Sequence, residues 1–275
     1  MDCICLLLLG TGSMRLDKLA IKVATIVAGF TLTQLSACVG NTTGDRDNYS
    51  VNTLVDTGEI TENSDRFIGK SVLIRNDVLQ IIGNRGLILD KDRLIDGEPI
   101  LVINMSETSI EISHDKTPEI LIDGKVERFS KNSIEQKYDL NLESEIYGQY
   151  EGKPVIIATS LIMSPDPEDI TANPEIYYNR PLAIKGEVDD VEDYGIFEID
   201  EEKAFGGEDL LVVQFGSQAA LNEEQTVIVY GVLRKFAMKE LLQDYDLDWD
   251  SSVQTQIEAK HQHKPVLVTN KIQFL

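Results

Sequence analysis

Apolar and polar residues alternate through much of the chain after residue 70, which is the pattern of half-buried β-strands. Val72, Ile74 and Val78 lie at even spacing in the first copy, and Leu182, Ile184 and Val188 do so in the second, which fits one buried face of a strand. Further short strands are predicted near 86–90, 99–104, 119–129 and 155–162, and again near 195–199, 209–214, 226–236 and 266–274. The pattern therefore predicts a mainly β protein.

The strand pattern occurs twice along the chain. At a constant offset of 110, residues 63–104 align without a gap with residues 173–214. Two later blocks follow at offsets of 107 and 111, and they align Tyr138-Asp139-Leu140 with Tyr245-Asp246-Leu247 and Lys153-Pro154-Val155 with Lys264-Pro265-Val266. Three ungapped blocks in the same order indicate a tandem duplication.

Five short strands per unit, with a bend in the first, are typical of a small closed barrel of the OB type. Asn76 and Gly186 share one position inside the first strand, where we expect a bulge or bend. Between the fourth and fifth strands lie polar, Gln- and Glu-rich stretches, which predict a helical insertion in each unit. We therefore expect two tandem five-stranded OB-type barrels, covering residues 63–165 and 166–275.

Residues 1–37 have the order of a secretory signal peptide. Arg15, Lys18 and Lys22 form a basic stretch, and an apolar run of 13 residues, 23–35, follows it. This run is shorter than the roughly 20 residues that a membrane-spanning helix needs. Because Met14 begins a conventional signal by itself, we expect residues 1–13 to be a start-codon artefact.

Leu35-Ser36-Ala37-Cys38 closes this segment and resembles the lipobox of bacterial lipoproteins. The resemblance implies that Cys38 is acylated and becomes the first residue of an exported, membrane-anchored protein that faces the periplasm or the cell exterior. The alternative is a signal cut elsewhere, or a buried helix with an unrelated cysteine. Residues 38–62, polar and without periodicity, are then expected to form a flexible tether after the lipidated Cys38.

The duplicated part resembles a family of tandem OB-fold lipoproteins and related envelope proteins of bacteria. The resemblance rests on the openings Ile68-Gly69-Lys70-Ser71-Val72 and Tyr178-Asn179-Arg180-Pro181-Leu182, on the Tyr-Asp-Leu segments, and on the Lys-Pro-Val start of the fifth strand. It covers roughly residues 63–275. It implies the fold and the location, but it supplies no catalytic residues to carry over.

The charge excludes some functions. The formal net charge is −22, and loss of residues 1–37 removes three basic and two acidic residues and leaves −23. Nucleic acid is therefore not expected as a partner, because phosphate backbones are bound by clustered Lys and Arg. No cysteine follows Cys38, and no motif places a nucleophilic serine or a phosphate-binding loop. We expect a non-enzymatic protein without a cofactor.

Two acidic stretches are candidate cation sites. In the second unit, alternating carboxylates could ligate Ca²⁺, which takes six to eight oxygen ligands. The first stretch occupies the expected connection between strands one and two, and the second follows the predicted fourth strand. Their residues are Asp189, Asp190, Glu192 and Asp193, and Asp244, Asp246, Asp248 and Asp250. The alternative is a solvated acidic turn and a segment that buries Tyr245, Leu247 and Trp249.

The first unit is apolar where the second is acidic. Leu79, Ile81 and Ile82 occupy the equivalent connection, and they could form an apolar contact surface. Alternatively, these residues pack at a seam between the two domains. Because the copies diverge at the loop that often helps OB folds bind ligands, this loop is the expected functional region.

Histidines and tyrosines supply two further candidates. His261 and His263 would share one face of an extended segment and could bind Zn²⁺ or Cu²⁺, although surface histidines beside a turn are the commoner case. His114 has no visible partner in the sequence. Exposed tyrosines could stack on sugars, the candidates being Tyr147, Tyr150, Tyr178 and Tyr194.

Taken together, these patterns favour a lipid-anchored binding or scaffolding module for a protein partner in the cell envelope. The acidic surface would steer basic partners towards it. Binding of a divalent cation or an oligosaccharide by the second domain is the alternative. Single-stranded nucleic acid binding, a common use of OB folds, comes third because the charge opposes it.

Overall fold

The computed structural model describes residues 53–90, 98–108, 118–201, 208–217 and 219–275. The predicted signal peptide 1–37, the lipidation site Cys38 and His114 lie outside the described residues. Among the described residues no helix is long and apolar enough to cross a membrane.

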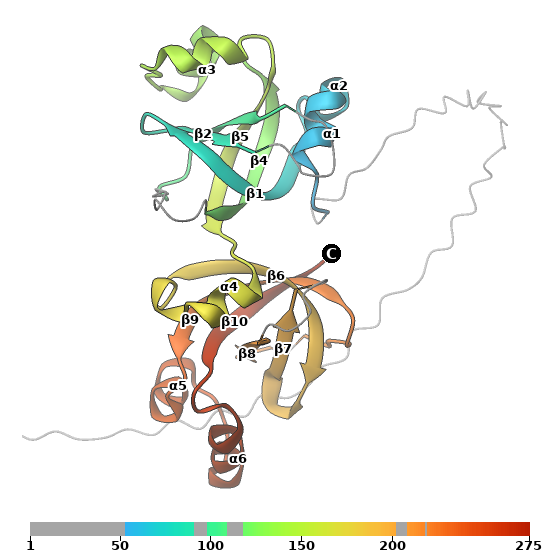
Figure 1. The fold of residues 1–275 in the computed structure, drawn as a ribbon, viewed down its shortest axis with the longest axis vertical. Helices are drawn as coiled ribbons and strands as arrows, with labels where there is room; N and C mark the ends of the chain where they lie inside the picture. Colours follow the sequence, from blue (N-terminus) through green and yellow to red (C-terminus); the bar gives the residue numbers. More distant parts are fainter. Residues whose placement is uncertain (1–52, 91–97, 109–117, 202–207, 218) are drawn as a thin grey trace, which may run out of the picture. The chain divides into compact units, whose positions relative to one another are not determined.

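The first half of the described chain is a closed barrel of five strands (Figure 1). β1 pairs with β2 and β4, β3 pairs with β2 and β5, and β4 pairs with β5. Only the β3–β5 pairing is parallel. This ring confirms the prediction of a mainly β fold with a closed five-stranded barrel. The strands are β1 (Ser71–Ile82), β2 (Gly86–Leu89), β3 (Ile100–Asn104), β4 (Glu119–Arg128) and β5 (Pro154–Met163).

The second half repeats these pairings strand for strand. β6 pairs with β7 and β9, β8 pairs with β7 and in parallel with β10, and β9 pairs with β10. The two halves therefore share one connectivity, as their aligned sequences require. The strands are β6 (Pro181–Val191), β7 (Ile196–Asp200), β8 (Leu210–Gln214), β9 (Thr226–Lys235) and β10 (Pro265–Phe274).

The first strand of each half is longer than the alternation predicted, and its irregularity lies elsewhere. β1 runs regularly beside β4 past Asn76, so the expected bulge at that position is wrong. The register of β1 against β2 shifts between Val78 and Gln80, and that of β6 against β7 shifts between Val188 and Val191. Gly186, at the position of Asn76, instead permits a close approach, because a Cβ there would lie 2.7 Å from Asp200 O.

A second repeated position needs glycine for the same reason. Gly124 in β4 and Gly231 in β9 face the backbone of the last strand of their barrels. A Cβ at Gly231 would lie 2.5 Å from Val268 O, and one at Gly124 would lie 2.8 Å from Ile157 O. Real Cβ atoms do not approach this closely, so the recurrence of glycine in both halves follows from strand packing.

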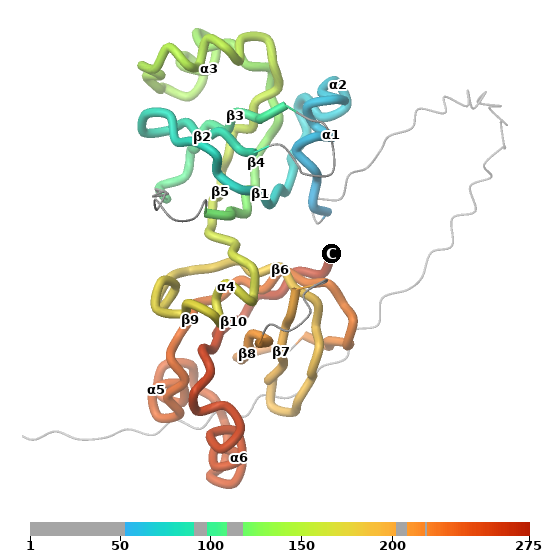
Figure 2. The backbone as a smooth tube through the Cα atoms, viewed as in Figure 1, coloured from blue at the N-terminus to red at the C-terminus, as the bar shows by residue number. Residues whose placement is uncertain are grey.

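Helices lie between the fourth and fifth strands of each half. In the first half these are α3 (Lys131–Tyr138) and the 3₁₀ helix η1 (Glu145–Tyr150), and in the second α5 (Met238–Tyr245) and α6 (Ser251–His261). Each group packs at one end of its own barrel, as the tube in Figure 2 shows. Short helices also precede each barrel: α1 (Thr57–Glu62), α2 (Ser64–Phe67), α4 (Pro167–Ala172) and η2 (Pro174–Ile176).

The tether predicted to run to residue 62 is too long. Val55 and Ile60 are buried in the cluster that fills the first barrel. The backbone N–H of Val55 also donates to Leu73 O at 2.8 Å. This packing places the described segment from Leu54 onwards in the folded body, and the expectation of a flexible chain fails for 54–62.

Each half buries two apolar clusters. One lies among the strands, and the other lies between the strand ends and the helices. In the first half the second cluster includes Ile82, Ile88, Tyr147 and Tyr150. In the second half it includes Trp249, together with residues of α5 and α6. These helix-covered barrel ends are where the two halves differ in chemistry.

Candidate functional site

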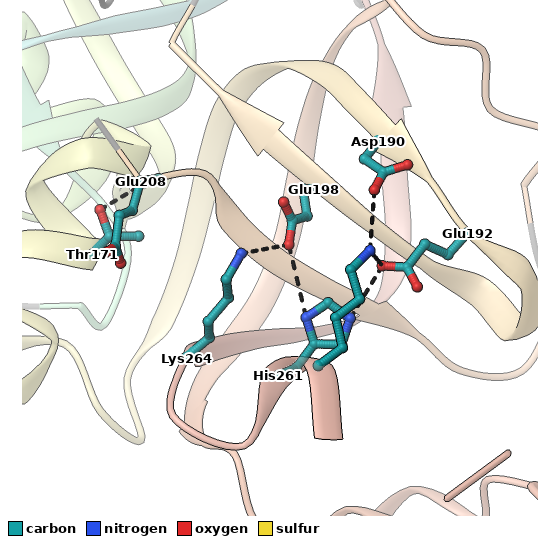
Figure 3. A network of polar contacts seen from close by, with 8 residues as sticks. Thr171, Asp190, Glu192, Glu198, Glu208, His261 and Lys264 are labelled. Atoms are coloured by element: carbon teal, nitrogen blue, oxygen red, sulfur yellow. Dashed lines mark hydrogen bonds and ion pairs between the residues drawn. The ribbon is translucent and has the colours of Figure 1, made fainter. Parts of the chain in front are cut away.

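The candidate site joins the β6–β7 hairpin to the end of α6 (Figure 3). Asp250 begins α6 by accepting hydrogen bonds from the backbone N–H groups of Ser252 and Val253, at 2.8 and 3.0 Å. The helix then ends at His261, so that Lys260 and His261 reach the hairpin.

His261 is the centre of this site. Its side chain is 0% exposed, and Nε2 donates to Glu192 Oε1 at 3.1 Å. Nδ1 is buried without a hydrogen-bond partner among the described residues, and Glu198 Oε1 lies 3.8 Å away. The imidazole therefore sits between two carboxylates and is hydrogen-bonded to only one of them.

Each of the two carboxylates, Glu192 and Glu198, forms an ion pair with a lysine. Lys260 Nζ donates to Glu192 Oε1 at 2.9 Å and to Asp190 Oδ2 at 3.3 Å. Lys264 Nζ donates to Glu198 Oε1 at 2.6 Å, and the Glu198 side chain is 9% exposed. The network thus ties the last strand of the hairpin and its turn to α6 and the segment that follows α6.

The surroundings change the proton affinity of these groups. Burial lowers the pKa of His261, and Lys260 and Lys264 lower it further, against the opposite pull of Glu192 and Glu198. The hydrogen bond to Glu192 raises the pKa of Lys260. Neutral imidazole and charged lysine are therefore the favoured forms at neutral pH.

The first barrel has an apolar cluster in place of this network. Ile82 aligns with Glu192 and Ile88 with Glu198 at the offset of 110, and Tyr150 aligns with His261 at 111. All three residues are buried and belong to one apolar cluster. Replacement of such a cluster by charged groups does not in general add stability, because burying charge is costly. The exchange therefore marks this end of the second barrel as a functional candidate.

The accessible part of the site is the hairpin tip. Tyr194 is 48% exposed and Val191 is 39% exposed. Tyr194 has φ of 65° and Gly195 has φ of 75°, so two consecutive residues adopt the left-handed region. Tyrosine is strained there, and such strain is found where the surrounding structure holds a functional residue in place.

The acidic run after α5 does not form one site. Asp244 Oδ2 accepts from Arg234 Nη2 at 2.9 Å, and Asp250 caps α6. Asp246 ends α5 with φ of 50°, and Asp139 ends α3 with φ of 53°, so the repeated Tyr-Asp-Leu segment is a helix end. Asp248 is exposed. Trp249 is buried and Tyr245 and Leu247 pack beside it, as the alternative interpretation predicted.

The acidic stretch of the hairpin is also divided. Asp189 and Asp190 belong to β6 and not to the connection where they were expected. Glu192 and Asp190 are ion-paired with Lys260, whereas Asp189 and Asp193 are exposed. Among the described residues no group of three or more His, Cys, Asp or Glu side chains could hold a metal ion. The structure therefore does not bring the eight predicted Ca²⁺ ligands together.

The apolar contact surface predicted for the first half is corrected by its burial. Ile82 is 2% exposed, and Ile81 packs against the barrel interior, so neither forms a free surface. Both belong to β1, because this strand continues through the expected connection. Leu79, 49% exposed, is the most accessible of the three, and Ile81 is partly buried. Ile82 belongs to the cluster of its own barrel end, which also differs from a seam between domains.

The predicted histidine pair does not form, and two of the four tyrosines considered for stacking are buried. His261 is buried at the end of a helix, while His263 is exposed in the following turn, so they share no face of an extended segment. Tyr147 and Tyr150 are 2% and 8% exposed, which makes them unavailable for stacking on a sugar.

Sequence reasoning missed Glu198, Lys260 and Lys264 entirely and took His261 for a surface residue. A signal for three of the network positions, Glu192, Glu198 and His261, was present in the aligned copies. In the alignment, Ile82, Ile88 and Tyr150 of the first unit correspond to Glu192, Glu198 and His261 of the second. Because an apolar core position rarely becomes charged alone, this joint change indicates a buried polar cluster.

Comparison with known proteins gives no family. No family model matches the sequence, and no curated protein matches it. Among solved structures, one described as "Crystal structure of a putative aspartyl-tRNA synthetase from Leishmania major Friedlin" is 11% identical, with a TM-score of 0.23. The match covers 45% of this chain and only 22% of that one. A TM-score of this size carries no conclusion about function.

Proposed function

We propose that this protein is a lipid-anchored envelope protein that binds a protein partner and catalyses no reaction. The observation that carries the proposal is the β6–β7 hairpin, which exposes Tyr194 and Val191 and is fastened to α6 through Glu192. OB-type barrels bind ligands with this hairpin loop and with the connection between strands four and five. In the second half these two segments meet.

The charge around the tip defines the kind of partner. Asp189 and Asp193 are exposed beside Val191 and Tyr194, and the chain as a whole has a formal net charge of −22. A basic protein segment with an apolar anchor residue complements this surface. Electrostatic steering makes such association faster at low salt than at high salt.

Burial of His261 supports a binding role over catalysis, and ion pairing weighs against the cation alternative. His261, the one described histidine in a charged network, is 0% exposed and cannot touch a substrate in this arrangement. Of the tyrosines considered for sugar stacking, Tyr147 and Tyr150 are buried in the first half, whereas Tyr178 of the second half is partly exposed and Tyr194 is exposed. In the cation alternative, lysine and arginine already occupy several of the predicted ligands.

The lipid anchor is proposed from the lipobox-like Leu35-Ser36-Ala37-Cys38. Two or more acyl chains hold a protein on a bilayer stably, whereas one chain holds it only marginally. Metabolic labelling with a fatty-acid analogue tests this step. Label on the wild-type chain and none on Cys38→Ala support it, and an unlabelled wild type removes the anchor from the proposal.

Photo-crosslinking in intact cells tests the binding surface. A photoreactive amino acid at position 194 should capture one protein, and the same amino acid at position 84 provides the matched control. Asn84 is exposed and aligns with Tyr194 in the first barrel. The captured protein should co-purify with the wild type and be lost with Tyr194→Ala. Equal capture at both positions, or co-purification that survives Tyr194→Ala, would overturn the assignment of the hairpin tip.

A further inference from the structure

The buried imidazole of His261 lies where the hairpin meets α6, and one of its nitrogens is unused. Nε2 is hydrogen-bonded to Glu192, which directly precedes the hairpin turn. Nδ1 has no hydrogen-bond partner among the described residues. A buried histidine in this state can take up one proton, and the new charge would have to be accommodated inside the contact.

The groups facing His261 come from every element packed around it. Glu192 belongs to the hairpin and Glu198 to β7, and their Oε1 atoms lie 3.1 and 3.8 Å from the ring nitrogens. Lys260 on α6 and Lys264 after α6 approach the same two oxygens at 2.9 and 2.6 Å, and Lys260 also contacts Asp190 Oδ2 of β6 at 3.3 Å. The ring of Phe236, 6.5 Å away between centroids, supplies an apolar neighbour.

This arrangement disfavours a protonated ring. Glu192 and Glu198 each already pair with a lysine, and Asp190 contacts only Lys260, so an imidazolium would have to share two carboxylates that are already neutralised. The side chain is 0% exposed, and water cannot solvate the charge while the contact is closed. Opening the contact would expose the ring to solvent and restore its ordinary proton affinity.

We propose that His261 is a proton-operated latch: as neutral imidazole it holds the β6–β7 hairpin against α6, and uptake of one proton releases the hairpin. The inference rests on the proposed function, because the released hairpin carries Tyr194. Acidification then weakens partner binding by loosening the surface that presents this side chain.

The direction of the effect follows from linkage. Burial lowers the pKa of His261 in the closed arrangement, so the proton binds more tightly to the open one. Each tenfold difference in proton affinity between the two arrangements shifts the opening equilibrium by up to about tenfold once the pH falls below both values. Stability of the contact is present above the ordinary histidine value and is lost as the pH falls through the lowered one.

The corresponding end of the first barrel is packed with apolar residues in place of the titratable network. There Ile82, Ile88 and Tyr150 are buried together, and no imidazole stands among them. The chain therefore offers a matched variant, Glu192→Ile with Glu198→Ile and His261→Tyr, which gives the second barrel the residues of the first. This variant should fold and should lack the response to acid.

An NMR titration of the full-length protein from about pH 8 to about pH 5, without any partner, tests the latch. The ring protons of His261 should titrate below the ordinary histidine value, and backbone amides of 191–197 should shift with the His261 midpoint. His263→Gln should leave this response intact, and His261→Gln should abolish it. The proposal would be overturned if His261 had an ordinary midpoint, or if the chemical shifts of the hairpin amides did not change at that midpoint.

Two readouts separate this inference from the function on which it rests. If the triple variant does not fold, as judged by its thermal melt, the His261→Gln titration still decides the latch. Crosslinking from position 194 decides partner binding independently. A latch without a crosslinked partner leaves the proton response and removes the proposed function, whereas a partner captured equally at both pH limits removes the latch alone.

Discussion

Tyr194 combines exposure with a backbone conformation that tyrosine rarely adopts. Its φ of 65° places it in the left-handed region, where an L-residue with a large side chain is strained by roughly 1–2 kcal/mol. A glycine follows it and shares the conformation, so the turn itself would tolerate a smaller residue at 194. The side chain is therefore kept at a cost in stability, which fits its proposed role in binding.

Tyr194→Asn is expected to raise the free energy of unfolding by about 0.5–1 kcal/mol, because asparagine tolerates the left-handed region better. The same change should abolish co-purification of the partner. Glu224→Asn is the matched control, since Glu224 is exposed with φ of 64° and lies outside the hairpin. It should give a similar gain in chemical denaturation and leave binding unchanged; a loss of binding with Glu224→Asn would count against the role given to the hairpin.

Glu119 is a second residue whose surroundings oppose its charge. It lies 2.6 Å from Arg75 Nη2, yet its pKa is raised to about 7. Burial is the largest cause and exceeds the attraction of Arg75, and Asp166, which shares the same guanidinium at 2.6 Å, adds repulsion. A carboxyl whose folded pKa exceeds its unfolded pKa stabilises the protein in acid and loses this contribution as the pH rises.

The stability of the wild type relative to Glu119→Gln should therefore fall by roughly 3 kcal/mol as the pH rises from the ordinary glutamate value to above 7. Denaturation at a series of pH values measures the difference. Glu127→Gln should show the opposite trend, because hydrogen bonds from Lys137 and Tyr138 outweigh burial and lower the pKa of Glu127. A flat difference for Glu119→Gln would show that Glu119 is already ionised throughout this range.

At the scale of elements, close strand packing explains which glycines recur. Gly231→Ala would place a Cβ 2.5 Å from Val268 O, so β9 and β10 would have to separate. We expect a loss of about 2–4 kcal/mol in chemical denaturation. Gly148→Ala is the control, since nothing lies within 4 Å of the added atom. It should be neutral or slightly stabilising, and equal losses at both positions would contradict the packing argument.

A surface ion pair beside the inserted helices has opposite polarity in the two halves. Arg234 and Asp244 pair at 2.9 Å, and the aligned residues of the first half are Glu127 and Lys137, which also pair. In both halves the next residue on the helix is a tyrosine that hydrogen-bonds to the strand residue of the pair. Tyr138 bonds to Glu127, and Tyr245 bonds to Arg234. A joint reversal of this kind indicates that the pair, and not either charge, is required.

Arg234→Glu alone should destabilise the protein by about 1 kcal/mol, because it sets two carboxylates side by side. Adding Asp244→Lys should recover most of that loss, since it recreates the pair of the first half. A double-mutant cycle in chemical denaturation measures the coupling, which we expect at about 1 kcal/mol because the second change restores most of the loss. Additive effects of the two changes would mean that the pair contributes nothing.

For the whole molecule, the duplication made the fold predictable and the site difficult. Alternating residues such as Val72 and Ile74 report burial directly, so strand positions and the closed five-stranded barrel followed from the sequence. Burial at the ends of β1 and β6 did not, because a bulge shifts the alternation there. For the same reason the sequence pattern wrongly predicted Ile82 to lie in a loop and Glu192 to be an unpaired carboxylate.

Membrane attachment is the prediction that concerns the entire chain. The wild type should sediment with membranes and resist a high-salt wash, because lipid anchoring does not depend on charge. Cys38→Ala should remain in the soluble fraction after export or accumulate unprocessed. A wild-type protein released by salt alone would indicate electrostatic attachment, which a chain of net charge −22 makes unfavourable at an anionic surface.

The exchange of Ile82, Ile88 and Tyr150 for Glu192, Glu198 and His261 has a consequence for how such a chain can change. The first copy has an apolar cluster at this end of its barrel, and the stability of such a cluster does not depend on pH. The second copy has charged and titratable side chains there, and their interactions depend on ionisation. Fewer substitutions should therefore be tolerated at these positions. Random mutagenesis should find single hydrophobic replacements accepted at the first end and sharply limited at the second, where one replacement leaves a neighbouring charge without its partner.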